Sequence, residues 1–381
     1  MRLLVIGDIS VIFTYEYVTE IASKFPDCKV DILSFAPRKE ANTEREEKLI
    51  ALGCNIFYQP QYKLFKLHKL LHILIRFAET VRYRICKKYD VINIHFPGID
   101  SWAVCRYAPE KTRVITSLYG SDVLRAGKRS LDMIKKLLVR SDAVTVASSY
   151  IKEKVSKKFN AQFDDKTEIV RYGSNAAACM SDAIAKYTKA ECKKHFGFPK
   201  ERITVLCGYN GSRAQRHMEI LNELKKLPKA VQEKIFLIFQ CSYGFDEIYK
   251  KELSAVLAES HLAGVIITDF MQGEILAKFR NSIDIFLNLQ PTDVLSATMI
   301  EELESRAIVV KGDWLCYPDL EERNIYMRSI SDMKKLSSEM EDIVANYSEE
   351  LKKVEANKGI WEILSWEKQY DKWEKIICDI K

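Results

Sequence analysis

The stretch FLNLQPTDVLSATMIEELESRAIVVKGDW, from Phe286 to Trp314, contains in one piece the pattern that decides the fold of this chain. A short apolar run opens it, a polar loop and a segment of helical period follow, and a second apolar, β-branched run begins at Ala307. Strand-type runs that alternate with helical segments predict parallel strands joined by crossover helices.

The same alternation extends over the rest of the chain. Strand-type runs of a first series begin at Leu3, Lys29, Asn55, Val91, Arg113 and Ala143, and those of a second series at Ile203, Lys234, Gly264, Ile283 and Ala307. Because 381 residues exceed what one hydrophobic core usually supports, the two series predict two domains. The predicted fold class is α/β, with two doubly wound domains that face each other across a cleft, where ligands of open sheets bind.

The composition is that of a folded globular protein. Hydrophobic residues make up 47% of the chain and charged residues 29%, a balance that excludes a disordered polyelectrolyte. The ten cysteines form no CxxC pair, as expected of buried thiols in a reducing compartment. The N-terminal MRLLVIGD enters a strand directly without a signal peptide, and no apolar run is long enough to cross a bilayer. We therefore expect a cytoplasmic protein.

Two carboxylates flank the predicted helix start in the opening stretch. Asp293 lies in the loop, Glu301 follows eight positions later, and the helix begins near Ser296, a favoured N-cap residue. The free N–H groups and positive dipole end of a helix attract phosphate, whereas carboxylates accept hydrogen bonds from sugar hydroxyls. Together they suit a nucleotide-sugar. An ordinary strand, loop and helix with surface acids is the alternative.

With these residues the chain resembles the GT-B glycosyltransferases, and among them the family 4 enzymes of bacterial surface polysaccharide synthesis. Their donor motif is a Glu, seven residues and a second Glu, and Asp293 and Glu301 hold these two positions. The resemblance implies that Asp293 contacts the donor sugar at the catalytic centre and that Glu301 binds the ribose. The first acid is one methylene shorter than in the family, and Val294, Leu295 and Ser296 replace the usual Gly-Phe-Gly.

The resemblance also implies a reaction and its partners. A sugar passes from a nucleoside diphosphate, UDP or GDP, to an acceptor hydroxyl with retention, and the acceptor is a glycan or a polyprenyl-linked glycan. No cofactor is implied beyond the donor substrate. The transition state resembles an oxocarbenium ion with charge growing on the leaving diphosphate, which cations and a helix N-terminus stabilise. No Asp-x-Asp pair stands in a suitable loop, so we expect no metal ion.

Domain roles follow from the same resemblance. We expect a Rossmann-like acceptor-side domain over residues 1–175, an interdomain linker over 176–200 and a Rossmann-like nucleotide-sugar-binding domain over 201–355. Residues 356–381 are expected to form a C-terminal helix that crosses back to the first domain. Aromatic residues, which bury large areas on docking, occur along it. They are Trp361, Trp366, Tyr370 and Trp373.

The loop GYNGSRAQRH, from Gly208 to His217, follows the first strand of the second series. The family places a basic pair there that neutralises the diphosphate. Arginine suits that role because its planar fork holds two phosphate oxygens, and the N–H groups of a polar turn add to the cradle. The candidates are Asn210, Gly211, Ser212, Arg213 and Arg216. A solvated loop with a helix-starting serine is the alternative.

The sequence LYGSDV, from Leu118, occupies the place of the family's acceptor-side loop, with Tyr119 where histidine is common. The resemblance implies that Tyr119, Ser121 and Asp122 lie close to the acceptor. Asp122 either binds the acceptor and helps to remove its proton, or caps a helix that begins near Val123.

The segment from Tyr62 to Lys88 is both basic and apolar. As a helix it places leucines on one face and Lys66, Lys69 and Arg76 largely on the other. Such a segment either lies in the headgroup layer of an anionic membrane, at the inner face of the plasma membrane, or is a core helix with a solvated edge. The net charge of +6 agrees with the first reading, but it equally suits anionic sugar nucleotides. No nucleic-acid-binding module is recognised.

Two other functions fit the same architecture. A nucleotide-sugar 2-epimerase would need a set of acid and base groups to move protons at the sugar. A non-catalytic GT-B partner subunit is compatible with the replaced motif positions.

Overall fold

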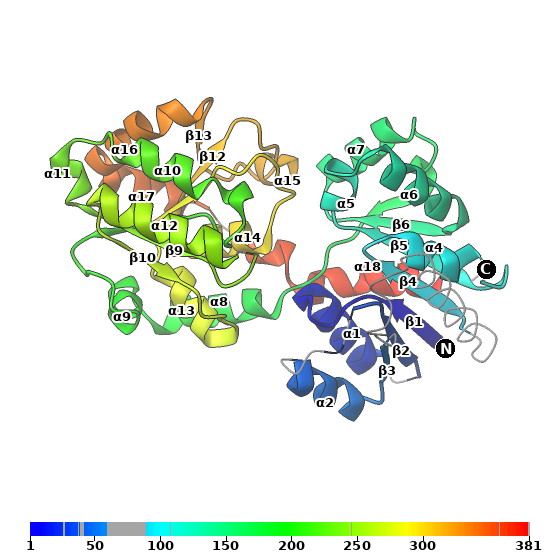
Figure 1. Cartoon of the computed structure of the whole chain (residues 1–381). Coiled ribbons are helices and arrows are strands. Elements are labelled where there is room, and N and C mark those ends of the chain that lie inside the picture. The colour runs from blue at the N-terminus through cyan, green and yellow to red at the C-terminus, as the bar shows by residue number, and fades with distance from the viewer. Residues whose placement is uncertain are drawn as a thin grey trace. The chain divides into compact units, whose positions relative to one another are not determined.

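The computed structural model describes residues 1–25, 27–36, 38, 42–58, 89–106, 108–244, 246–357 and 359–379. The chain divides into two compact units. Unit 1 comprises Met1–Gly173 and Trp366–Lys381, and unit 2 comprises Ser174–Ser365. Figure 1 shows both units with their elements labelled.

Unit 1 is built on a parallel sheet that has seven strands among the described residues, in the order β3-β2-β1-β4-β5-β6-β7. The strands are β1 (Arg2–Ile6), β2 (Lys29–Ser34), β3 (Asn55–Tyr58), β4 (Val91–His95), β5 (Arg113–Leu118), β6 (Ala143–Val146) and β7 (Thr167–Ile169). The helices are α1 (Ile12–Lys24), α2 (Thr43–Ala51), α4 (Ile99–Arg106), α5 (Ser121–Leu124), α6 (Lys128–Arg140), α7 (Ser149–Lys158), η3 (Asp164–Lys166) and α18 (Trp366–Cys378).

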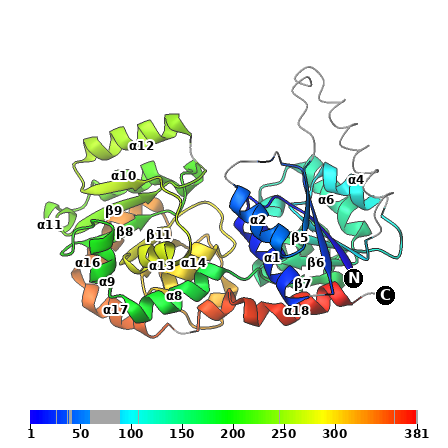
Figure 2. The same cartoon turned by 90° about the horizontal axis from the view of Figure 1, so that it is seen from below.

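Helices cover both faces of this sheet, because its strands are apolar on both sides. Leu3 and Val5 of β1 pack in one cluster with side chains of α1, α2 and α18, whereas Leu4 and Ile6 pack in another with side chains of α4 and α6. The last helix of the chain, α18, therefore completes the core of the unit that holds the first strand (Figure 2).

Unit 2 is built on a parallel sheet with six described strands, in the order β10-β9-β8-β11-β12-β13. The strands are β8 (Ile203–Cys207), β9 (Ile235–Gln240), β10 (Gly264–Ile267), β11 (Ile285–Asn288), β12 (Ile308–Gly312) and β13 (Arg328–Ile330). The α-helices are α8 (Asn175–Lys186), α9 (Lys189–His195), α10 (His217–Leu224), α11 (Lys229–Gln232), α12 (Glu247–Ser260), α13 (Gly273–Asn281), α14 (Ala297–Glu304), α15 (Pro318–Glu321), α16 (Leu336–Ala345) and α17 (Tyr347–Glu355). Short 3-10 turns are η4 (Arg213–Gln215), η5 (Met333–Lys335) and η6 (Trp361–Ile363).

The predicted doubly wound α/β class is confirmed in both units. Each sheet has a switch point, between β1 and β4 in unit 1 and between β8 and β11 in unit 2, where the strand order reverses. Residues 176–200, expected as a linker, contain α8 and α9 and cluster with unit 2. The reason is packing, because Met180 and Ala183 of α8 bury themselves against Ala277 of α13.

Candidate functional site

The loops after β8 and β11 flank the switch point of the unit 2 sheet. Gly208, which follows β8, has a φ of 74°, a left-handed conformation that favours glycine. A Cβ atom at this position would lie 2.8 Å from Gln215 Oε1 and 3.0 Å from His217 Nε2. Glycine is therefore required here, and it allows Gln215 and His217 to pack closely against the turn.

Gln290 connects three loops by hydrogen bonds. Its side-chain N–H groups donate to the Tyr209 hydroxyl at 3.0 Å and to Asn288 Oδ1 at 3.2 Å. Its Oε1 accepts from Gln215 Nε2 at 3.2 Å, and its backbone carbonyl accepts from Trp314 Nε1 at 2.8 Å. Because Gln290 is buried, these bonds are shielded from water and hold together the loops after β8, β11 and β12.

Asp293 lies in the loop between β11 and α14. Its Oδ2 accepts hydrogen bonds from Asn288 Nδ2 at 3.0 Å and from the Tyr317 hydroxyl at 2.8 Å. The backbone N–H and the hydroxyl of Ser296 each donate to the same oxygen at 3.4 Å. The other carboxylate oxygen, Oδ1, takes part in none of these bonds.

Ser296 is the N-cap residue of α14, and its hydroxyl accepts from the Met299 N–H at 3.3 Å. Leu295 before it has a φ of 65°, which turns the chain from the loop into the helix. No acidic residue stands in the first turn of α14. The first N–H groups of a helix have no partner within it, so this helix start offers donors and a positive dipole end beside Asp293.

Glu301 is buried on α14, and its Oε2 accepts from Arg280 Nε at 2.9 Å. Arg280 comes from the end of α13 and is only 3% exposed. It also donates to Gln240 Oε1 at 2.9 Å, to Thr298 Oγ1 at 3.0 Å and to Glu302 Oε1 at 3.3 Å. The acid that the resemblance assigns to the ribose is thus held in a buried ion pair.

One guanidinium faces two carboxylates in this cluster. Burial raises the pKa of Glu302 to about 8, although Arg280 acts in the opposite direction. Desolvation therefore favours the neutral form of Glu302, and Arg280 favours its charged form.

In the polar turn after β8, some backbone N–H groups already donate hydrogen bonds within the protein. The Gly211 N–H donates to the Tyr243 carbonyl at 2.8 Å, and the Ser212 N–H donates to Asn210 Oδ1 at 2.9 Å. The Ser212 hydroxyl accepts from the Ala214 N–H at 3.3 Å. These two loop N–H groups are thus already engaged, which leaves the neutralisation of a diphosphate mainly to cations.

The two arginines of this loop lie in different places. Arg216 Nη1 donates to the Leu289 carbonyl at 3.4 Å, and its guanidinium lies 5.4 Å from the centre of the Trp314 ring. Arg213 pairs instead with Glu252 of α12, with Nη2 and Oε2 2.8 Å apart. The structure therefore brings Arg216, but not Arg213, to the loops after β11 and β12.

In unit 1 the loop after β5 is tied to Asp122. Its carboxylate accepts from the Tyr119 N–H at 3.0 Å and from the Gly120 N–H at 2.8 Å, and burial raises its pKa. The reading of Asp122 as the cap of a helix that begins near Val123 is wrong, because α5 begins at Ser121 with Gly120 as its N-cap residue. Ser121 is exposed beside it.

His95, at the end of β4, supports the same loop. The Tyr119 hydroxyl lies 2.9 Å from His95 Nδ1, and the Thr14 hydroxyl lies 3.3 Å from it. The Tyr119 ring stacks on Phe96, with ring centres 4.1 Å apart. Burial lowers the pKa of His95 to about 3, so the ring is neutral. Asp122 and Tyr119 are therefore fixed at the carboxyl edge of the unit 1 sheet.

Sequence reasoning missed four residues of these two sites. Arg280, Gln290, Tyr317 and His95 are all buried or nearly so. His95 and Gln290 carried a signal, because a polar side chain at the carboxyl end of a parallel strand lies at the ligand edge. The sequence contained no such signal for Arg280 and Tyr317, since they belong to segments that precede and follow the predicted motif.

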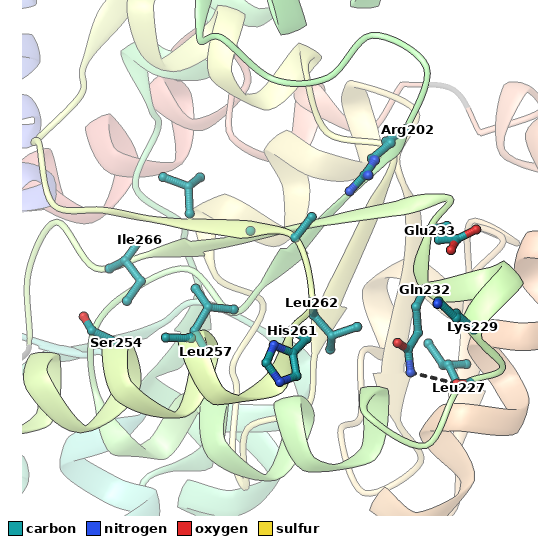
Figure 3. A pocket seen from close by; sticks show the side chains of 14 residues that line it. Arg202, Leu227, Lys229, Gln232, Glu233, Ser254, Leu257, His261, Leu262 and Ile266 are labelled. Carbon is teal, nitrogen blue, oxygen red and sulfur yellow. Dashed lines mark hydrogen bonds between the residues drawn. The ribbon is translucent and has the colours of Figure 1, made fainter.

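A groove in the described part of unit 2 lies elsewhere. It has a volume of about 990 Å³ and is lined by residues of α12, of β10 and of the segments that lead into β8, β9 and β10, among them Arg202, Leu257 and Leu262 (Figure 3). None of the predicted site residues lines it. Since the predicted site follows the carboxyl ends of the strands, the groove is a separate feature.

The described residues contain no group of three His, Cys, Asp or Glu side chains able to hold a metal ion. No helix among them has the length and apolarity needed to cross a bilayer. The segment from Tyr62 to Lys88, predicted to contact a membrane, lies outside the described residues.

Residues 16–176 match the family model described as Glycosyltransferase Family 4. No curated protein matches the chain by sequence. HepE from Anabaena in complex with UDP shares 13% identity over 99% of both chains, with a TM-score of 0.74. A glycosyltransferase from Rickettsia africae ESF-5 shares 11% over 99% of both chains, with a TM-score of 0.71. UDP-GlcNAc 2-epimerase from Neisseria meningitidis, bound to UDP-GlcNAc, shares 12% over the whole of both chains, with a TM-score of 0.63.

At such identities the likeness to solved structures shows the fold alone. The chain therefore has a GT-B fold, and its residues 16–176 are similar to Glycosyltransferase Family 4.

Proposed function

We propose that the chain transfers a sugar from a nucleoside diphosphate, UDP or GDP, to an acceptor hydroxyl during glycan assembly. The observation that carries the proposal is the arrangement at the start of α14. There Asp293, Glu301 and a capped helix N-terminus lie beside the switch point of unit 2. The solved HepE structures with UDP and with UDP-glucose support a nucleotide-sugar as the donor class.

In the proposed reaction the bond between the anomeric carbon and the diphosphate breaks, and a bond to the acceptor oxygen forms with retention. The diphosphate leaves with the bonding electrons, so its growing charge must be stabilised. Arg216 and the N-terminus of α14 supply that stabilisation without a metal ion. Glu301, oriented by Arg280, accepts hydrogen bonds from the ribose.

The acceptor side of the proposal rests on Tyr119, Ser121 and Asp122. The N–H groups of Tyr119 and Gly120 hold the Asp122 carboxylate, and burial raises its pKa, which makes it a stronger base for the proton of the acceptor hydroxyl. The exposed hydroxyl of Ser121 adds a hydrogen-bonding group beside it. We propose a glycan, carried on a polyprenyl lipid, as the acceptor.

Incubation with UDP- and GDP-sugars tests this function. A glycosyltransferase releases UDP or GDP, and it does so faster when a suitable acceptor is added. A nucleotide-sugar epimerase would instead yield a new sugar nucleotide without releasing UDP. A protein that binds no nucleoside diphosphate and leaves all sugar nucleotides intact would contradict the proposal.

Arg216 and Arg213 provide a matched pair for testing the diphosphate site. Arg216→Gln is expected to weaken UDP binding by about 10- to 100-fold, the value of a hydrogen bond to a charged group, and to leave uridine binding unchanged. Arg213→Gln should change neither ligand, because Arg213 is paired with Glu252. Titration calorimetry with UDP and uridine measures both. Equal losses for the two ligands, or a larger loss in Arg213→Gln, would assign the diphosphate elsewhere.

Peripheral contact of residues 62–88 with an anionic membrane stays a prediction. Reversal of Lys66, Lys69 and Arg76 to Glu should release the protein from anionic vesicles, since each cation contributes about 1 kcal/mol near such a surface. Co-sedimentation at low and high salt measures this, and the affinity for UDP should not change. A wild-type protein that stays in the supernatant at low salt contradicts it.

A further inference from the structure

We propose that Tyr317 is the positioning residue of the subsite for the donor sugar. Together with Asn288 it binds one oxygen of Asp293 and so presents the other oxygen to a sugar hydroxyl. The inference rests on the proposed function, because it states how the same site selects its sugar.

Three side chains form a closed hydrogen-bonded triangle at this point. Asn288 Nδ2 donates to the Tyr317 hydroxyl at 2.9 Å and to Asp293 Oδ2 at 3.0 Å, and the Tyr317 hydroxyl donates to the same Oδ2 at 2.8 Å. Asn288 is itself held, because its Oδ1 accepts from Gln290 Nε2 at 3.2 Å. Because fixed donors bind one oxygen of the carboxylate, the carboxylate has a single orientation. A specific sugar subsite requires such a fixed orientation.

The protonation state of Tyr317 favours this role. Its side chain is 1% exposed and packs in the core beneath the loops after β11 and β12. Burial raises the pKa of the phenol, and the neighbouring charge of Asp293 raises it further. The hydroxyl therefore stays protonated and remains a donor to Asp293 across the physiological range of pH.

The same contacts indicate the class of sugar. The four hydrogen bonds to Asp293 come from neutral groups of Asn288, Tyr317 and Ser296, so no cation neutralises the carboxylate through these contacts. Its Oδ1 can accept from a hydroxyl but would repel a second carboxylate. The geometry thus selects an uncharged sugar with a free hydroxyl and disfavours a uronic acid.

The test separates the sugar from the nucleotide. Dissociation constants are measured by calorimetry for UDP, UDP-glucose and UDP-glucuronate, with GDP and GDP-mannose in parallel. The sugar contribution is the ratio of the dissociation constant of the diphosphate to that of the matching hexose nucleotide. In Tyr317→Phe this ratio is expected to fall about tenfold, which corresponds to the loss of one hydrogen bond of about 1.4 kcal/mol. The dissociation constant of the diphosphate itself should stay within about twofold of the wild-type value. Wild type should bind UDP-glucose more tightly than UDP-glucuronate.

Two further variants sharpen the result. Tyr326→Phe is the matched control, because Tyr326 also donates to a carboxylate in unit 2, Glu350 Oε2 at 2.6 Å, and it should change no affinity. Asp293→Asn should abolish the tighter binding of the nucleotide-sugar relative to the diphosphate. The double variant Asp293→Asn, Tyr317→Phe should show no further effect, since the tyrosine acts through the aspartate.

Other outcomes overturn the inference. Equal weakening of UDP and UDP-glucose in Tyr317→Phe would mean that the tyrosine only supports the loops. If wild-type protein binds every nucleotide-sugar no more tightly than the matching diphosphate, Asp293 binds no sugar hydroxyl. Absence of binding to both UDP and GDP would instead refute the proposed function, and this inference with it.

Discussion

Replacement of Arg280 by alanine is expected to lower the free energy of unfolding of unit 2 by about 3–5 kcal/mol, the cost of breaking a buried ion pair by removing one partner. The substitution leaves Glu301 and Glu302 buried without the guanidinium that binds both. It also removes hydrogen bonds to Gln240 and Thr298. Arg280→Lys should lose part of this amount, because an ammonium keeps the charge but lacks the planar fork.

Arg328→Ala is the control for this prediction. Arg328 also pairs with three acids, Glu339, Asp342 and Glu350, but its side chain is 21% exposed. Because Arg328, Glu339 and Asp342 are more solvated than the Arg280 cluster, Arg328→Ala should cost less than Arg280→Ala. Urea unfolding followed by circular dichroism compares the two variants. Similar losses in both would show that the Arg280 cluster depends on its central charge no more than the partly solvated Arg328 cluster does.

Replacement of Trp373 by alanine is expected to destabilise unit 1 by about 3–5 kcal/mol, as for other large-to-small changes of a buried tryptophan. The side chain is fully buried, with its ring centre 4.8 Å from that of Tyr17 and 5.1 Å from that of Tyr172. Its Nε1 donates to the Arg171 carbonyl at 2.8 Å, so the variant also removes a buried hydrogen bond. Thermal and urea unfolding measure the loss.

Tyr370, on the same helix, serves as the control. It is only partly buried and packs on Phe25 with ring centres 5.3 Å apart. Tyr370→Ala should therefore cost clearly less than Trp373→Ala. A Trp373→Ala protein as stable as wild type would mean that α18 adds little to the core of unit 1.

Much of the fold can be predicted from the sequence, because strands of a parallel sheet that are buried on both faces consist of continuous apolar residues. The run that begins at Ile203 is β8, and the run that begins at Ala307 contains β12. The strands that the pattern did not predict are short and mixed in character. They are β7, with the sequence TEI, and β13, with the sequence RSI, each three residues long. Such edge strands are specified by neighbours in space and not by their own composition.

The sequence predicts only part of the candidate site in unit 2. A motif in one segment shows Asp293, Ser296 and Glu301, but it does not show what each carboxylate contacts. Arg280 precedes β11 and ends a helix, where a cation is ordinary, and yet it determines the environment of Glu301. Likewise, nothing near Tyr317 in the sequence indicates a bond to Asp293. Pairing between distant segments follows from tertiary packing, which local pattern does not encode.

The return of the chain to unit 1 has a consequence for biosynthesis. Unit 2 is encoded between the two parts of unit 1, so all of it leaves the ribosome before α18 does. Its sheet and helices can thus assemble during translation, since domains generally fold as units. The hydrophobic core around Trp373, by contrast, is completed only after α18 has been made, although it also contains residues of β1. The nascent unit 1 therefore carries an incompletely covered apolar face until α18 has been made, and chaperones can bind there for the whole time that unit 2 is being synthesised.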